Sequence, residues 1–80
     1  MWYYMTKYSF DPTKEVFGPF ATAEEAYANM KKNADTEHNI DENENEWDTE
    51  IYYDEENGEI TIVNYFGTNK DITEFFIFEI

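Results

Sequence analysis

The pattern of hydrophobic and polar positions changes along the chain and predicts extended structure at its start. Residues 2–10 carry aromatic side chains on both faces of an extended segment, as expected of a strand that is partly covered on each side. Asp and Pro at 11–12 begin a turn, and residues 15–17 are expected to pair back briefly. Gly and Pro at 18–19 interrupt any element that precedes them.

A helix is predicted to begin after Thr22. Glu25 follows three residues later, the spacing of a capping box in which hydroxyl and carboxylate bond the free amides of the first turn. Lys31 and Lys32 suit the negative end of this helix, and residues 35–46 have no apolar periodicity, so they are predicted to form a long solvated loop. The helix carries one apolar stripe at helical spacing, made of Ala23, Ala26, Tyr27, Met30 and Ala34.

The remainder of the chain has a period of two residues and predicts three further strands. Residues 47–54 alternate in the way of a strand with one face in the core. The Asn-Gly pair at 57–58 favours a tight type I′ turn and a return strand over 59–66. A second turn at 67–71 leads into a last strand over 72–80.

The predicted fold class is α+β. At 80 residues the chain suits a single domain, 1–80, with two layers in the order β-α-β-β-β and one helix packed on an antiparallel meander sheet. The first strand lies either beside the last strand or at the far edge. Because one helix covers only one face of a sheet, apolar residues on both faces of the last strand, such as Phe75 and Phe76, are covered either by the long loop or by a partner.

Acidic residues are concentrated in one part of the chain. The formal net charge is −14, and twelve acidic side chains lie between Asp35 and Glu59 without any Lys or Arg. Such an excess is larger than the solubility of a small domain requires, and it opposes compaction. It also argues against direct binding of nucleic acid or an anionic membrane, because both depend on cations of the protein.

Catalytic and metal-binding patterns are weak. The chain has no Cys, and neither its one histidine, His38, nor its one serine, Ser9, stands in a nucleophile motif. Asp41, Asn43 and Asn45 repeat the first ligand positions of a calcium loop, but the glycine and the bidentate glutamate that should follow are missing. The sequence therefore predicts a protein that is not an enzyme and that binds no metal or cofactor.

The location is predicted from what the chain lacks. The first residues have no basic segment followed by a long apolar one, and no apolar stretch approaches the roughly 20 residues of a membrane span. The absence of cysteine favours an intracellular location. We therefore expect a cytoplasmic protein.

The acidic segment is the predicted partner-binding surface. Residues two apart in a strand lie roughly 6.6–6.8 Å apart on one face, a spacing comparable with that of successive phosphates along a nucleic-acid strand. The strand over 47–54 would hold part of the charge at this spacing. The carboxylates would form one continuous anionic face, with Tyr52 interleaved as an aromatic contact. The predicted partner-binding residues are Asp35, Glu37, Asp41, Glu42, Glu44, Glu46, Asp48, Glu50, Tyr52, Asp54, Glu55, Glu56 and Glu59.

This surface predicts a DNA mimic that inhibits a basic nucleic-acid-binding protein by occupying its groove. The chain is small, acidic and free of cysteine, and in composition it resembles, as a class, the anti-restriction and anti-CRISPR inhibitors of phages and mobile elements. Two alternatives are an immunity or antitoxin-like protein that masks a basic toxin nuclease, and a homodimeric structural subunit that uses an aromatic sheet face. A charge run that is only a solvated surface also fits the sequence.

Overall fold

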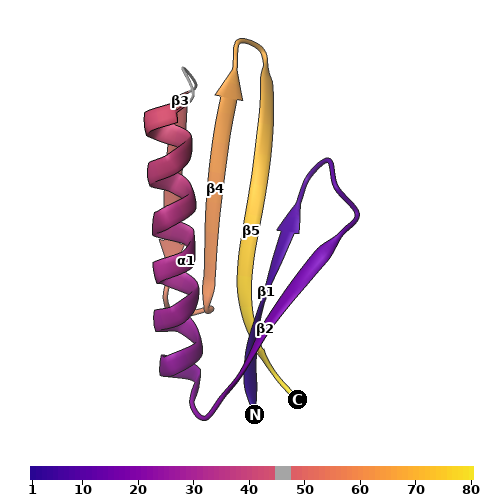
Figure 1. The fold of residues 1–80 in the computed structure, drawn as a ribbon, viewed down its shortest axis with the longest axis vertical. Coiled ribbons are helices and arrows are strands. Elements are labelled where there is room, and N and C mark those ends of the chain that lie inside the picture. Colours follow the sequence, from indigo (N-terminus) through magenta and orange to yellow (C-terminus); the bar gives the residue numbers. More distant parts are fainter. Residues whose placement is uncertain (45–47) are drawn as a thin grey trace.

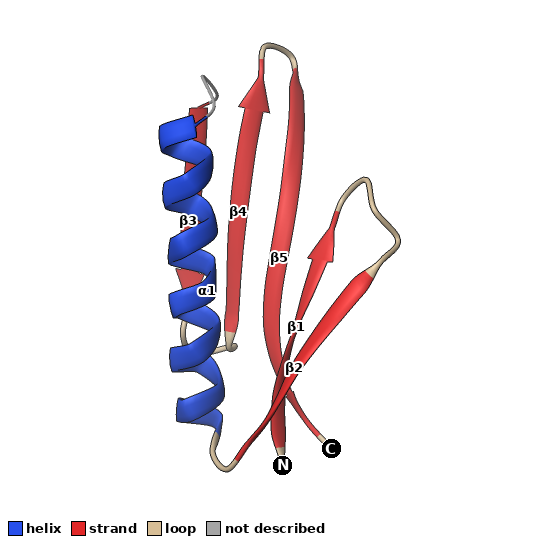
Figure 2. Ribbon diagram, in the orientation of Figure 1, coloured by secondary structure: helices blue, strands red, loops and turns tan. Residues whose placement is uncertain are grey.

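One helix packs on one face of a five-stranded antiparallel sheet in the computed structural model, which describes residues 1–44 and 48–80 (Figures 1 and 2). The sheet order is β2-β1-β5-β4-β3. The predicted α+β class is confirmed, with one strand more than expected. The elements are β1 (Trp2–Tyr8), β2 (Lys14–Phe20), α1 (Ala23–Glu44), β3 (Asp48–Asp54), β4 (Glu59–Phe66) and β5 (Asn69–Glu79).

The N-terminal hairpin differs from its prediction. Strand β1 pairs with β5 along its whole length, so the first strand lies beside the last one. The brief pairing expected at 15–17 is a full strand of seven residues, β2, whose register on β1 shifts between Trp2 and Tyr4. Pro19 is tolerated because β2 is an edge strand, where one side of the backbone needs no partner.

The helix begins as predicted. The backbone N–H of Glu25 donates to Thr22 Oγ1 at 3.1 Å, and the backbone N–H of Ala21 donates to Glu25 Oε2 at 3.2 Å. These two bonds satisfy amides that have no partner within the first turn of the helix. The predicted cap at Thr22 is therefore confirmed, whereas the Glu25 carboxylate accepts from Ala21, one residue before the amide that a capping box uses.

The helix ends much later than predicted. The loop expected at 35–46 is wrong for residues 35–44, which continue α1, while 45 and 46 lie outside the described residues. Glu37 and Asp41 follow Ala34 at helical spacing, and the sheet opposite them is also polar. Tyr8 donates its hydroxyl to Glu37 Oε1 at 3.5 Å, and Asn64 donates Nδ2–H to Asp41 Oδ2 at 3.2 Å. The stripe therefore continues as a polar stripe, which a search for apolar periodicity does not detect.

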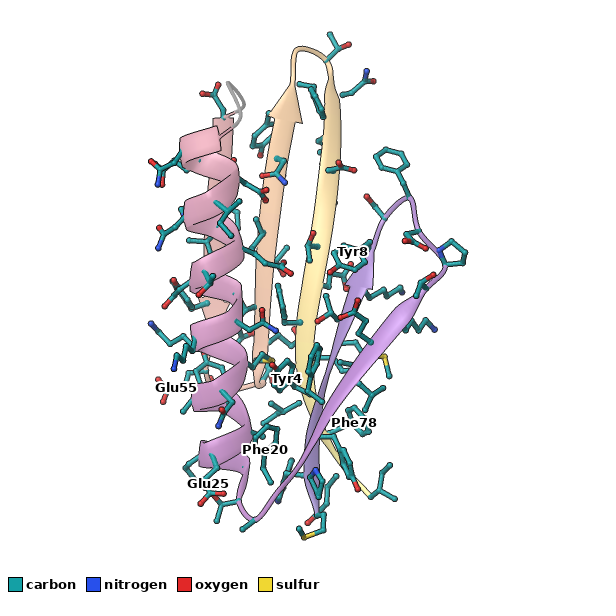
Figure 3. All side chains as sticks on the ribbon, in the orientation of Figure 1. Tyr4, Tyr8, Phe20, Glu25, Glu55 and Phe78 are labelled. Atoms are coloured by element: carbon teal, nitrogen blue, oxygen red, sulfur yellow. The ribbon has the colours of Figure 1, made fainter. Side chains whose placement is uncertain are left out.

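The core lies between α1 and the sheet. Its buried side chains include Met30 and Ala34 from the helix, which the predicted stripe contained. Tyr4 stacks on Phe17 and Phe20 at ring-centroid distances of 4.7 and 5.9 Å, and Figure 3 shows Tyr4 beside the helix. Within the described ranges, no helix has both the length and the apolar character that crossing a membrane requires.

The turn between β3 and β4 is longer than the predicted type I′ turn. Among the described residues only glycines have positive φ, so Asn57 does not take the conformation that type I′ needs. Instead the Asp54 carboxylate accepts from the backbone N–H of Asn57 at 3.1 Å and from its Nδ2–H at 2.8 Å. The Gly58 carbonyl accepts from the backbone N–H of Ile77 at 2.9 Å. The turn is thereby fixed to β5.

Gly58→Ala should destabilise the fold more than Gly67→Ala. Both glycines have positive φ, 67° and 57°, so alanine costs roughly 1–2 kcal/mol at either position. A Cβ at Gly58 would also lie 2.4 Å from Ile77 Cγ1, whereas a Cβ at Gly67 meets nothing within 4 Å. We expect urea denaturation to show a further loss of about 1–3 kcal/mol for G58A. Equal losses for the two variants would refute the contact.

Candidate functional site

Carboxylates follow the outer face of the edge strand β3. Thr49, Ile51 and Tyr53 point toward α1: Ile51 packs against the core and Tyr53 donates its hydroxyl to Asp35. Since side chains alternate along a strand, the residues between them face the opposite side of the sheet. We call this group the acidic strip, which continues through the turn into β4 and consists of Asp48, Glu50, Asp54, Glu56 and Glu59.

No ion pair in the described part of the chain neutralises the acidic strip. Asp54 lies directly opposite Glu59 in the β3–β4 register, a pairing of like charges that opposes folding. The ion pairs found in residues 1–44 and 48–80 are Lys31–Asp35 and His38–Glu42, and neither involves the strip. Hydrogen bonds from the Asn57 side chain and backbone hold the pKa of Asp54 below its ordinary value. The strip is therefore an ordered, unneutralised row of carboxylates.

Two tyrosines accompany the acidic strip. Tyr52 lies on the same face of β3 and is 53% exposed, and Tyr65 lies opposite Asp48 on β4. Tyr52 donates its hydroxyl to Glu50, which raises the pKa of Tyr52 to about 12. Exposed tyrosines offer rigid contact area with a polar end, as is common at protein interfaces.

The helical members of the predicted surface divide between the two flanks of α1. On the flank toward β3, Asp35 accepts from Lys31 Nζ at 3.0 Å and from the Tyr53 hydroxyl. Burial opposes ionisation of Asp35, but these two hydrogen bonds together lower its pKa. Glu42 lies 3.8 Å from His38 Nδ1. Lys31 therefore partly neutralises Asp35, unlike the carboxylates of the acidic strip.

Glu37 and Asp41 lie on the other flank, between α1 and the helix-covered face of the sheet. They line a groove of about 360 Å³, whose other walls are Tyr8, Ile40, Asn64, Asp71 and Thr73. Burial raises the pKa of Glu37, and the nearby negative charge of Asp41 adds to the shift. The expectation of one continuous anionic face is therefore wrong. These two carboxylates belong to the helix–sheet interface, on the opposite side of the sheet from the strip.

Two members of the predicted surface are not placed. The side chain of Glu44 and the whole of Glu46 lie outside the described residues. In the described part of the chain, no group of three or more His, Asp or Glu side chains is arranged to hold a metal ion. Asp41 and Asn43 lie in α1, where residues two apart point in different directions, so the calcium-loop spacing does not form a loop.

A second groove lies between the N-terminal half of α1 and β3. Tyr27 and Tyr53 contribute aromatic walls, and Lys31 Nζ lies 4.9 Å from the centre of the Tyr53 ring. We call it the tyrosine groove, of about 670 Å³, lined by Ala23, Glu24, Tyr27, Ala28, Lys31, Tyr53, Glu55 and Ile77. Of these residues, the sequence singled out only Glu55 as a partner contact. No local signal marks the others, because they come from α1, β3, the turn and β5.

The face of the sheet away from α1 is bare. No described element covers it, as Figure 2 shows, and we call it the open face. Tyr3 stacks on Phe78 there, with ring centroids 5.7 Å apart. Met5 on β1 lies between Val16 on β2 and Phe76 on β5, and Val16 is 54% exposed. The expected apolar surface on the second face is therefore present, and it adjoins the acidic strip at β3.

Comparisons of the chain with protein-family models, with curated proteins and with solved structures found no match in any of the three.

Replacing Glu37 by Gln should stabilise the fold at neutral pH but not at acidic pH. A carboxyl whose pKa is raised by folding contributes its full stability below the unfolded pKa and loses it as the pH rises through the folded pKa. Glutamine has no charge and still accepts from Tyr8. We expect Tm at pH 7 to rise by roughly 2–8 °C, the effect in a domain of this size of about 0.5–1 kcal/mol, a value kept small because solvent screens a half-buried charge.

The control is Glu56→Gln, which removes one exposed charge from the acidic strip. Its Tm gain at pH 7 should be smaller, because only general repulsion is relieved. Thermal unfolding at pH 3.5, relative to the parent protein at the same pH, should show no gain for Glu37→Gln. A Tm at pH 7 that falls below that of the parent protein would contradict the assignment of Glu37 as a desolvated charge.

Proposed function

We propose that this protein is a non-catalytic, DNA-mimic inhibitor that occupies the basic surface of a nucleic-acid-binding protein. The observation that carries the proposal is the acidic strip: carboxylates on two paired strands and the turn between them, mostly exposed and with no cationic partner among the described residues. Carboxylates that serve the fold, such as Asp35 and Asp41, accept hydrogen bonds from other elements. Within the strip, Asp54 has such a role, because it accepts from Asn57 in the turn. In the described part of the chain no bond of this kind reaches Asp48, Glu50, Glu56 or Glu59, so a function outside the fold explains these four charges.

The strand gives the strip a regular spacing. Asp48 and Glu50 are two apart, so their side chains lie roughly 6.6–6.8 Å apart on one face. A basic groove that binds nucleic acid presents cations at the spacing of phosphates, and an ordered row of carboxylates can meet them with little loss of entropy. Tyr52 between Glu50 and Asp54 adds contact area, as a base or sugar does beside the phosphates.

The overall charge supports the same partner. At −14, with only five Lys and Arg, the chain repels nucleic acid and attracts basic proteins over long range. A DNA-binding effector of a restriction or CRISPR system is the target class that the composition suggests, and the cytoplasm is the place of action. A basic toxin nuclease is the alternative target, which a toxin gene beside the coding sequence would favour.

Removing charge from the acidic strip should weaken partner binding. The tagged protein is used to capture proteins from bacterial lysate at low salt, and we expect a basic nucleic-acid-binding protein that duplex DNA displaces. With that partner purified, Glu50→Gln/Glu59→Gln should raise Kd about tenfold, which is 1.4 kcal/mol. Added salt should weaken binding of the parent protein.

The matched control is Glu15→Gln/Glu79→Gln, which removes the same charge from exposed positions on β2 and β5. It should change Kd less than twofold. Equal effects of the two double variants would show that net charge alone drives binding. A partner that neither salt nor DNA displaces would contradict the mimic.

The open face favours a second candidate, a homodimer. Two such faces, stacked with their strands aligned, would bury the aromatic residues of both copies, including Tyr3 and Phe78. Lys7 and Lys14 on β1 and β2 of one copy can then face the acidic strip of the other. Five strands of at least seven residues span roughly 24 by 23 Å or more, which is a projected area of about 550 Å² at the least, against the roughly 800 Å² per partner of a standard interface.

This dimer should be nearly insensitive to salt, because apolar burial holds it together and screening weakens both the repulsion between two chains of charge −14 and the attraction of the lysines to the strip. Sedimentation should show similar dimer Kd values at 50 and 500 mM NaCl. Val16→Glu on the open face should raise that Kd at least tenfold, while Ile40→Glu, an equally exposed apolar position on α1, should not. A monomer at every salt concentration would exclude the dimer.

A further inference from the structure

The tyrosine groove has a shape fixed by the fold. The Gly58 carbonyl is bonded to Ile77 on β5, so the turn that carries Glu55 is held against the sheet beside α1. Figure 3 shows Glu55 next to the N-terminal half of the helix. Ile77 lies between these walls and supplies an apolar surface. At about 670 Å³ the groove falls within the size range of pockets that bind small ligands and side chains, roughly 300–1,000 Å³.

The ammonium group of Lys31 already lies over one aromatic ring of this groove. Lys31 Nζ lies 4.9 Å from the centre of the Tyr53 ring, within the distance at which the negative face of an aromatic ring attracts a positive charge. Lys31 also bonds Asp35 at 3.0 Å, which places it at one end of the groove. Tyr27 supplies a second ring whose face is free of any cation in the described part of the chain.

The groove is negative despite Lys31. Glu24 and Glu55 line it directly, from α1 and from the turn. Burial is the main cause that raises the pKa of Tyr27; the nearby negative charges of Glu55 and Asp54 add to the rise, and the positive charge of Lys31 opposes it. An aromatic wall with carboxylates at its rim suits an organic cation and repels anions.

We propose that the tyrosine groove binds a guanidinium group, as carried by an arginine side chain of a basic partner. A guanidinium stacks flat on a tyrosine ring and pairs with a carboxylate through two parallel hydrogen bonds, which an ammonium cannot do. Tyr27 would supply the ring, and Glu24 or Glu55 the carboxylate. That the arginine belongs to a basic partner rests on the proposed function. That the groove binds a guanidinium group does not depend on it.

The test uses N-acetyl-arginine methylamide and its neutral isostere, N-acetyl-citrulline methylamide, in NMR titrations of the folded protein. We expect saturable shifts of the ring signals of Tyr27 and Tyr53 and of the methyl signal of Ala28 with the arginine compound. The citrulline compound has the same shape without the charge and should give no saturable shift. Citrulline shifts that match those of arginine would overturn the assignment.

Variants locate the site. Glu24→Gln/Glu55→Gln should raise Kd for the arginine compound at least fivefold. The strip variant Glu50→Gln/Glu59→Gln should change it less than twofold, because these carboxylates do not line the groove. Shifts spread over all carboxylates without saturation would show diffuse ion pairing only and refute the site. All variants need amide spectra that match the parent protein; if Glu24→Gln/Glu55→Gln unfolds, the single variant Glu55→Gln replaces it.

The experiments can refute the guanidinium site and the proposed function independently of each other. If the groove binds no guanidinium but the strip variant still weakens the captured partner, the inference about the groove is wrong and the proposed function stands. If the arginine compound binds and no basic partner is captured, the groove stands and the DNA mimic is wrong.

Discussion

The structure depends on the packing of one helix against one face of a five-stranded sheet. Met30 and Ala34 are completely buried against Ile60, Ile62 and Phe75, and this contact decides which residues of each strand point inward. Because side chains alternate along a strand, every residue between two inward ones must face the bare side. The helix therefore determines on which face of the sheet the acidic strip lies. It also leaves half of the sheet surface available for a partner.

Much of the fold follows from local sequence signals. The wrong prediction of the helix end arises from contacts between residues that are distant in the sequence. Thr22 and Glu25 mark the helix start by hydrogen bonding within one turn, so a short window of sequence is enough. The helix end is missed because Glu37 and Asp41 keep the helical spacing but bond polar groups of the sheet. A method that follows apolar residues stops at Ala34. Polar partners on distant strands cannot be known before the sheet order is known.

The sequence likewise predicted only the part of the candidate site that lies within one element. Alternation along β3 correctly indicated that Asp48, Glu50 and Tyr52 share a face, since this is a property of the strand itself. Alternation along β3 could not show that Glu37 lies on the other face of the sheet. The position of Glu37 depends on α1, and the sequence predicted a loop there instead of a helix. The tyrosine groove has no counterpart in the sequence pattern, because α1, β3 and β5 meet there only after folding. Sites within one element can be predicted, and sites between elements require the tertiary structure.

Charges on an edge strand also have a purely protective role, because they prevent pairing with the edges of other sheets. That role explains one or two charged residues on β3, but not the whole strip. Glu56 lies in the turn and Glu59 on β4, which is not an edge, and Glu59 faces Asp54 across the register as a like charge. Placing those charges there destabilises the fold and adds no protection. The residues that exceed the protective need are therefore the ones that argue most directly for binding a basic partner.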